Sequence, residues 1–324
     1  MSNTLAWVLG GGGLLGSNVL QAMAQHRFGI EPWRLGSSGI PWRNPVQGRQ
    51  VLEAQTLEFV REVNTRGCSW AVLWCAGSGA VGSSNESLRV ETDYLNCLLY
   101  ALGKQLPQHR GKVLLVSSAG GVYGNNHKQP LTETSSCQPI SDYGRNKLLQ
   151  ESMLQEWVKE HPEISTLVAR ISNLYGPAPQ INTAHGLIPH ISRSILHRVP
   201  INIFVPLDTS RDYIYVDDCV SSLLEGLSRL GENGREHVLK IFHSGETKTI
   251  AGLIGVFSRL THGRVRIVCA TSPIASQQSL QLQFRSTVWV DLMPEQSISL
   301  TIGVQRVHAH MLSIFQTGRL PPVR

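Results

Sequence analysis

The sequence of 324 residues predicts an α/β fold in which a doubly wound parallel sheet carries a smaller C-terminal region. Three observations support this fold class. Apolar runs typical of buried strands alternate with segments of helical period, which is the pattern of β-α-β units. A glycine-rich loop stands between the first strand and the first helix. After about residue 174 the pattern becomes irregular, with many Pro and Gly, so a second region is expected there.

The individual elements follow from the period of the apolar residues. Strands are expected at 4–9 (TLAWVL), 70–76 (WAVLWCA), 112–117 (KVLLVS) and 165–171 (STLVARI). Helices are expected at 17–25, 87–104 and 143–160, where apolar residues recur at spacings of three and four. We assign 1–173, with 209–243 returning to it, to the sheet domain, and 174–208 with 244–324 to the smaller region. The glutamine-rich run at 277–283 is too short to indicate a low-complexity segment.

Composition excludes several classes of partner. The net charge of +6 comes from basic residues scattered singly, so no nucleic-acid groove is expected. The six cysteines form no Cys-x-x-Cys pair, which favours a reducing compartment. The apolar N-terminal segment has no basic residue before it and is broken by glycines, unlike a secretion signal. We therefore expect a cytoplasmic protein without a membrane partner. His185, His190 and His197 have no metal-site spacing, so no metal is expected.

The loop GGGGLLG at residues 10–16 has the context of a dinucleotide site. It follows a strand and opens a helix, as in a Rossmann-type fold. Glycines at Gly10, Gly13 and Gly16 let the backbone turn sharply and approach a pyrophosphate, and free N–H groups at the helix start bind its charge. With the intervening Leu14 and Leu15, these residues predict binding of NAD(P).

A further strand is expected after the first helix, ending in the region of residues 33–38, and the residue that closes it is expected to select the cofactor. An acidic side chain there would bond the ribose 2′-hydroxyl and repel a 2′-phosphate. The sequence has no acidic residue at this point but carries Ser37, Ser38 and Arg43. Hydroxyls and an arginine suit a 2′-phosphate, so NADP is expected to be preferred over NAD.

Tyr143 and Lys147 lie four residues apart and would share one face of a helix. A nearby positive charge favours the phenolate, which lowers a tyrosine pKa from about 10 toward the range of a catalytic acid or base. Taken alone, such a pair is also found on ordinary helix faces. Here it follows a dinucleotide loop and a Ser-Ser segment in the same chain.

Six motifs together resemble the extended short-chain dehydrogenase/reductase family, in its branch of NAD(P)-dependent nucleotide-sugar epimerases and dehydratases. They are GGGGLLG, WCAGSG, VSSAGGVYG, YGRNK, ARISNLYGP and SRDYIYVDD. The resemblance implies a Rossmann-type sheet that binds the cofactor and a C-terminal region that binds a nucleotide sugar. It also implies Tyr143 as acid and base, and Lys147 as the residue that bonds the nicotinamide ribose. Ala76, Gly77 and Ser117 would be further cofactor contacts.

The same resemblance implies a set of substrate contacts. Arg211 would pair with a phosphate, for which its fork-shaped group is suited; its alternative is a structural pair with Asp212 or Asp217. Arg285 would be a second phosphate ligand. The remaining implied contacts with the diphosphate, sugar and base are Ser118, Tyr143, Asn173, Gly186, Leu187, Asn202 and Phe204.

The reaction is narrowed by the residues that follow the two serines. Dehydratases of this branch carry an Asp-Glu pair where this chain has Gly120 and Gly121, so dehydration is not expected. We expect a nucleotide-sugar epimerase acting at C4, in sugar-nucleotide or surface-polysaccharide biosynthesis. An NADPH-dependent ketosugar reductase is the alternative, and an inactive cofactor-binding scaffold or sensor is the alternative from another class.

Two expectations remain open at this level. Ala119 occupies the position at which the family usually carries its catalytic hydroxyl. Ser118 is expected to replace it, unless Tyr143 works with water and the serines only bond the loop. A homodimer is expected through the helices at 87–104 and 143–160, although their apolar stripes would equally suit packing on a sheet. Those stripes contain Leu95, Leu99, Leu149, Met153 and Trp157.

Overall fold

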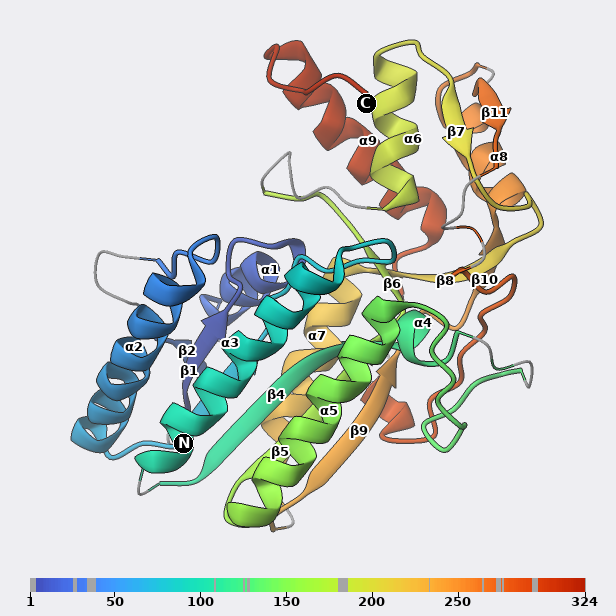
Figure 1. Ribbon diagram of the computed structural model, residues 1–324. Helices are drawn as coiled ribbons and strands as arrows, with labels where there is room; N and C mark the ends of the chain where they lie inside the picture. Colours follow the sequence, from blue (N-terminus) through green and yellow to red (C-terminus); the bar gives the residue numbers. More distant parts are fainter. Residues whose placement is uncertain are drawn as a thin grey trace.

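A six-stranded parallel sheet forms the centre of the computed structural model (Figure 1). Its order is β2-β1-β3-β4-β5-β9. The strands span Thr4–Leu9 (β1), Ile30–Pro32 (β2), Trp70–Trp74 (β3), Gly111–Ser118 (β4), Ser165–Ile171 (β5) and His237–Phe242 (β9). The structure describes residues 4–25, 28–33, 39–107, 109–124, 126, 129–179, 186–232, 234–263, 265–271, 275, 277–292 and 297–323.

Helices cover both faces of this sheet. One face carries α1 (Leu14–Met23) and α7 (Val216–Arg229), and the other carries α2 (Pro45–Arg66), α3 (Asn85–Lys104) and α5 (Asp142–Glu160) (Figure 1). Each face has its own apolar core, as a doubly wound sheet requires. The core beneath α1 and α7 continues into the C-terminal region through residues such as Ile191 and Phe257.

The C-terminal region lies beyond the carboxyl ends of the strands, at the top of Figure 1. It contains α6 (Leu187–Leu196), α8 (Ile250–Leu260), α9 (Leu300–Gln316) and a two-stranded sheet of β7 (Ile201–Ile203) and β11 (Ile267–Cys269). A three-stranded sheet of β10 (Thr247–Thr249), β8 (Ser210–Tyr215) and β6 (Asn173–Tyr175) lies between the two regions. The short elements α4 (Ala119–Val122) and η3 (Val290–Leu292) complete the order.

The predicted fold class is confirmed. The strands expected at 4–9 and 165–171 have the predicted bounds, and the helices expected at 87–104 and 143–160 begin only a residue or two earlier. Side-chain caps explain these starts, because Ser84 accepts the N–H of Ser87 and Ser141 accepts the N–H of Gly144. Within the described residues, no helix is both long and apolar enough to cross a membrane.

Candidate active site

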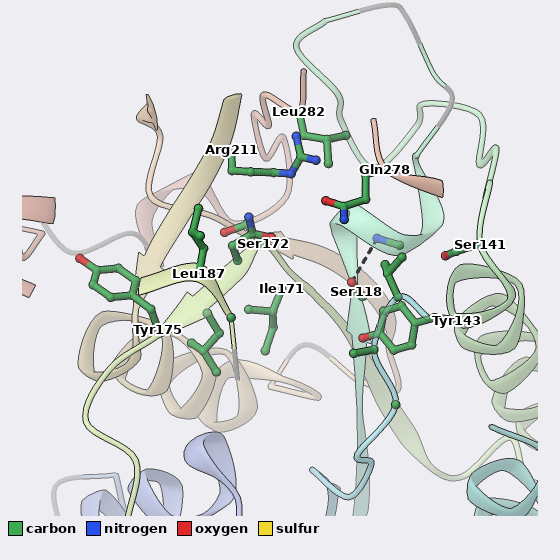
Figure 2. Close-up of a pocket in the computed structure, with 18 of the residues that line it drawn as sticks. Ser118, Ser141, Tyr143, Ile171, Ser172, Tyr175, Leu187, Arg211, Gln278 and Leu282 are labelled. Atoms are coloured by element: carbon green, nitrogen blue, oxygen red, sulfur yellow. Dashed lines mark hydrogen bonds between the residues drawn. The ribbon is translucent and has the colours of Figure 1, made fainter. Parts of the chain in front are cut away.

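A cavity of about 640 Å³ lies at the carboxyl ends of the parallel strands, beneath the C-terminal region. The loops after β1, β3 and β4 form its floor, and residues from β6, α6, β8 and the segment at 277–282 close it from the other side. Figure 2 shows Tyr143 and Ser118 on one side of this cavity and Arg211 on the other. Its volume lies in the range of cofactor and substrate pockets.

The glycine loop has the geometry expected of a pyrophosphate site. Gly10 has a φ of +87°, and a Cβ there would lie 2.5 Å from the carbonyl oxygen of Cys75. A Cβ on Gly16 would lie 2.3 Å from the carbonyl oxygen of Gly10, so only glycine permits this close contact of helix and loop. Gly13 begins α1 without a side-chain cap, which leaves the first N–H groups of the helix available to an anion.

The other predicted cofactor residues differ in their positions. Leu14, Leu15 and Gly77 line the cavity, and Ala76 is buried next to Gly10. Arg43 is exposed in the turn before α2 and does not line the cavity. Ser37 and Ser38 lie outside the described residues, so the proposed selection of NADP remains a prediction.

The two serines after β4 have different hydrogen bonds. Ser117 donates its hydroxyl to the buried carboxylate of Glu151 over 2.5 Å. Ser118 accepts the N–H of Gly121 over 3.1 Å at the start of α4, and its side chain lines the cavity (Figure 2). Ala119 is fully buried. Because Ser118 Oγ accepts a bond from the loop, its O–H remains free to donate to a ligand.

Tyr143 and Lys147 project from the first turns of α5. Tyr143 lies beside Ser118, since a Cβ on Gly121 would be 3.1 Å from the tyrosine ring and 3.3 Å from the serine hydroxyl. Lys147 is buried, with its Nζ 5.8 Å from the centre of that ring and 2.7 Å from Oε1 of Glu91. Burial by itself would lower the pKa of this ammonium, but the Glu91 carboxylate raises it above its ordinary value.

Arg211 points from β8 into the cavity (Figure 2). Its Nη1 donates to the carbonyl oxygen of Ser210 over 2.8 Å, and burial lowers the pKa of the guanidinium. Neither suggested structural partner pairs with it. Asp212 accepts bonds from Ser172 and from the turn at 244–245, and Asp217 pairs with Arg306 over 3.4 Å. Arg211 is therefore available to an anionic ligand.

The remaining predicted substrate contacts fall into two groups. Asn173, Gly186 and Leu187 line the cavity with Arg211. Asn202 and Phe204 are exposed, because alternate residues of a strand face opposite sides and the inward positions are taken by Ile201 and Ile203. The exposed Arg285 does not line the cavity either; its backbone N–H donates to the carbonyl oxygen of Leu131. The structure does not bring Asn202, Phe204 or Arg285 to this site.

The structure adds site residues that the sequence reading passed over. Gln277, Gln278, Ser279 and Leu282, from the glutamine-rich run, line the cavity. Gln278 directs its amide toward the side that holds Ser118 (Figure 2). Glu91 contacts Lys147 from α3. The sequence gives no signal for these site residues. The glutamine-rich run lies far along the chain from the other motifs, and Glu91 is a single acidic residue on a helix. Within the described residues, no cluster of His, Cys, Asp and Glu could hold a metal.

Comparisons with known proteins agree with this geometry. UDP-glucose 4-epimerase of Dictyostelium discoideum is 25% identical over 283 residues, covering 80% of this chain and 81% of that protein. dTDP-4-dehydro-6-deoxyglucose reductase of Escherichia coli is 34% identical over 143 residues, which cover 44% of this chain and only 43% of that protein. The crystal structure of UDP-glucose 4-epimerase from Thermotoga maritima, with UDP-glucose, superposes with a TM-score of 0.76 at 22% identity, covering 96% of this chain and all of the other.

A family model provides the assignment. The model of the NAD dependent epimerase/dehydratase family matches residues 6–241, which contain the glycine loop, the two serines, Tyr143, Lys147 and Arg211. The predictions of an extended short-chain dehydrogenase/reductase and of an enzyme of this class are confirmed. The chain belongs to the NAD dependent epimerase/dehydratase family.

Proposed function

We propose that the protein is an NAD(P)-dependent nucleotide-sugar epimerase that inverts C4 of its sugar. The observation that carries this proposal is one cavity with two chemically different sides. Tyr143 and Ser118 supply hydroxyl groups on one side. On the other side Arg211 supplies a guanidinium that has no carboxylate partner among the described residues. A nucleotide sugar has the matching parts, a sugar hydroxyl that must lose a proton and a diphosphate that binds arginine.

The residues present fit a nicotinamide dinucleotide. The glycine loop leaves space above the uncapped N-terminus of α1, where Gly10, Gly13 and Gly16 admit a pyrophosphate. When bound, the nicotinamide would accept a hydride from the sugar and return it. Lys147 uses two of its three N–H groups on Glu91 and Gln150, which leaves one for the ribose.

The proton chemistry belongs to Tyr143 and Ser118. Tyr143 would take the proton of the sugar hydroxyl as the hydride leaves. It would give the proton back after the ketosugar has rotated in the site and presents its opposite face. Ser118 would donate its free O–H to the reacting oxygen and stabilise charge that develops there. Gly120 and Gly121 have no side chain that could act as an acid or base, and a Cβ added at Gly121 would lie 3.1 Å from the Tyr143 ring. This part of the loop therefore supports epimerisation or reduction rather than elimination of water.

The alternative is an NADPH-dependent ketosugar reductase, which the match to the Escherichia coli reductase favours.

The test incubates pure protein with UDP-glucose and other nucleotide sugars in the presence of a trace of NAD or NADP. Continued epimer formation without net change in the nicotinamide supports the proposal. Loss of one NADPH for each ketosugar reduced would replace it with the reductase. Cofactor binding without either reaction would indicate a scaffold. Tyr143→Phe is the control, because it keeps the ring and removes the proton-transferring hydroxyl.

The preference for NADP over NAD is part of the proposal. It is supported by the residues at 37, 38 and 43, of which Arg43 is exposed. Dissociation constants of NADPH and NADH, measured by fluorescence, test it. Tighter binding of NADH would contradict the preference, and so would equal binding of both cofactors. Arg43→Gln should weaken NADPH binding and leave NADH binding unchanged if the 2′-phosphate contacts this residue.

A homodimer through α3 and α5 is a further proposal. Leu149 is 52% exposed and Met153 is half-buried on this surface, whereas Leu95, Leu99 and Trp157 are already buried in the core of the subunit. Tyr100 is also exposed there. Light scattering of the wild type and of a Leu149→Glu variant tests this interface.

We also propose the sheet domain of residues 1–173 and 209–243 as the cofactor-binding unit. The cytoplasm is the proposed location of the protein, since all six cysteines are free thiols.

A further inference from the structure

Lys147 is held by a buried carboxylate. Glu91 on α3 and Lys147 on α5 each have side chains only 8% exposed, and Oε1 of Glu91 lies 2.7 Å from Nζ of Lys147. The same Oε1 accepts a hydrogen bond from Nε2 of Gln150 over 3.1 Å. A buried charge pair is stable only when its remaining polar atoms also have partners, and these contacts provide them. Glu91 thus fixes the position of the lysine next to Tyr143.

Glu91 also contacts the loop after β3. Its Oε2 accepts the N–H of Gly79 over 3.3 Å, and Gly77 and Gly79 line the cavity. A Cβ on Gly77 would lie 2.7 Å from Oε1, so this glycine leaves space for the carboxylate. A Cβ on Gly79 would lie 3.2 Å from Oε2 and 3.4 Å from the Tyr143 ring. The carboxylate and the tyrosine ring therefore approach the same loop residue from two sides.

The charges around Lys147 come from two helices. On α3 the facing charge is Glu91, and on α5 the charged or titratable neighbours are Tyr143 and Glu151. Glu151 already pairs with Arg170 of β5 over 2.6 Å. The Lys147 ammonium is thus neutralised chiefly by Glu91. A neutralised ammonium stabilises a nearby phenolate less than a free one does.

We propose that Glu91 is a positioning residue that acts on Tyr143 through Lys147: it orients the ammonium, orders the loop at Gly77–Gly79 and weakens the positive charge that Tyr143 experiences. This inference rests on the proposed role of Tyr143 as acid and base.

The test is a titration of Tyr143 that needs no substrate. The phenolate absorbance of each variant is measured against the same variant carrying Tyr143→Phe, which isolates one of the seven tyrosines. Glu91→Gln keeps an acceptor for Lys147 and removes the negative charge. Its phenolate absorbance should then appear at lower pH than in the wild type, because the phenolate faces an ammonium without its carboxylate partner. Asp93→Asn, on the exposed side of the same helix, is the matched control and should not change the titration.

A double variant separates charge from structure. Glu91→Gln with Lys147→Gln buries no charge, so it should fold even where Glu91→Gln does not. Its Tyr143 pKa should return toward the wild-type value, since neither charge remains. A Glu91→Gln variant that titrates like Asp93→Asn, or a double variant that keeps the full shift, would overturn the proposal.

The pH profile of epimerisation should move with the titration. In the Glu91→Gln variant, the acid limb assigned to Tyr143 should shift to lower pH by a similar amount. An inactive wild type would refute the proposed function, while the titration would still decide the role of Glu91.

Discussion

Replacement of Arg211 by Gln should weaken substrate binding without destabilising the protein. The guanidinium is partly buried and has lost solvation, and its bonds within the described residues go to two backbone carbonyls, those of Ser210 over 2.8 Å and Leu280 over 3.4 Å. The shorter amide removes the charge that a diphosphate would use. A hydrogen bond to a charged group contributes about 1.5–3 kcal/mol, so the dissociation constant of the proposed nucleotide-sugar ligand should rise about 10- to 150-fold.

Calorimetric titration with UDP and UDP-glucose measures this effect at two salt concentrations, because the lost interaction is one of charge. The control is Arg259→Gln, an exposed arginine in the last turn of α8, which should bind like the wild type. Thermal unfolding of the free protein supplies the second readout. An unchanged dissociation constant, or a melting temperature that falls by several degrees, would refute the reasoning, since the first denies the contact and the second shows a structural arginine.

The remaining predictions concern the serines, the glycines and one buried lysine. Ser118→Ala should lower kcat by about tenfold or more in a steady-state assay. Ser117→Ala should lower the free energy of unfolding in urea by about 1–3 kcal/mol, since it removes a buried bond to Glu151. Gly121→Ala should lower kcat, because the added Cβ would lie 3.1 Å from the Tyr143 ring. Gly120→Ala should be tolerated, because its Cβ would lie 3.5 Å from Leu282. Equal kcat values for the two variants would contradict a steric effect on Tyr143. Burial lowers the pKa of Lys240 to about 8. Above that pH the unfolded chain therefore binds more protons than the folded protein does, and the free energy of unfolding should rise between about pH 8 and 10. Urea unfolding across this range should show the rise in the wild type and not in Lys240→Met.

Strong local patterns made much of the fold predictable. Strands β1 and β5 are short and mostly apolar, and the sequence analysis predicts both with the observed bounds. Helix α2 was not predicted, although Asn44 caps it, Pro45 opens it and Gly67 ends it with a φ of +60°. Its polar composition gave a weak apolar stripe, and the capping residues were the stronger signal there.

The candidate site was predictable only where its residues are close in sequence. The glycine loop and the Tyr143–Lys147 pair lie within single elements, so spacing along the chain describes their geometry. Gln278 and Glu91 reach the same place from other elements, and only the tertiary fold brings them there. For Asn202 and Phe204, motif position suggested the cavity, but the alternation of β7 turns Asn202 outward and Phe204, directly after the strand, is exposed as well.

The distribution of charge around the cavity links these observations to ligand choice. The nearby acidic groups all have partners: Glu91 binds Lys147, Glu151 binds Arg170, and Asp212 accepts bonds from Ser172 and Ser244. Among the described residues that line the cavity, Arg211 is the one that carries a charge. The electrostatic potential inside the cavity is therefore positive on the Arg211 side and nearly neutral beside Tyr143. An anionic ligand would place its phosphates at Arg211 and its uncharged sugar at Tyr143, because the reverse orientation would leave both the guanidinium and the diphosphate without a partner.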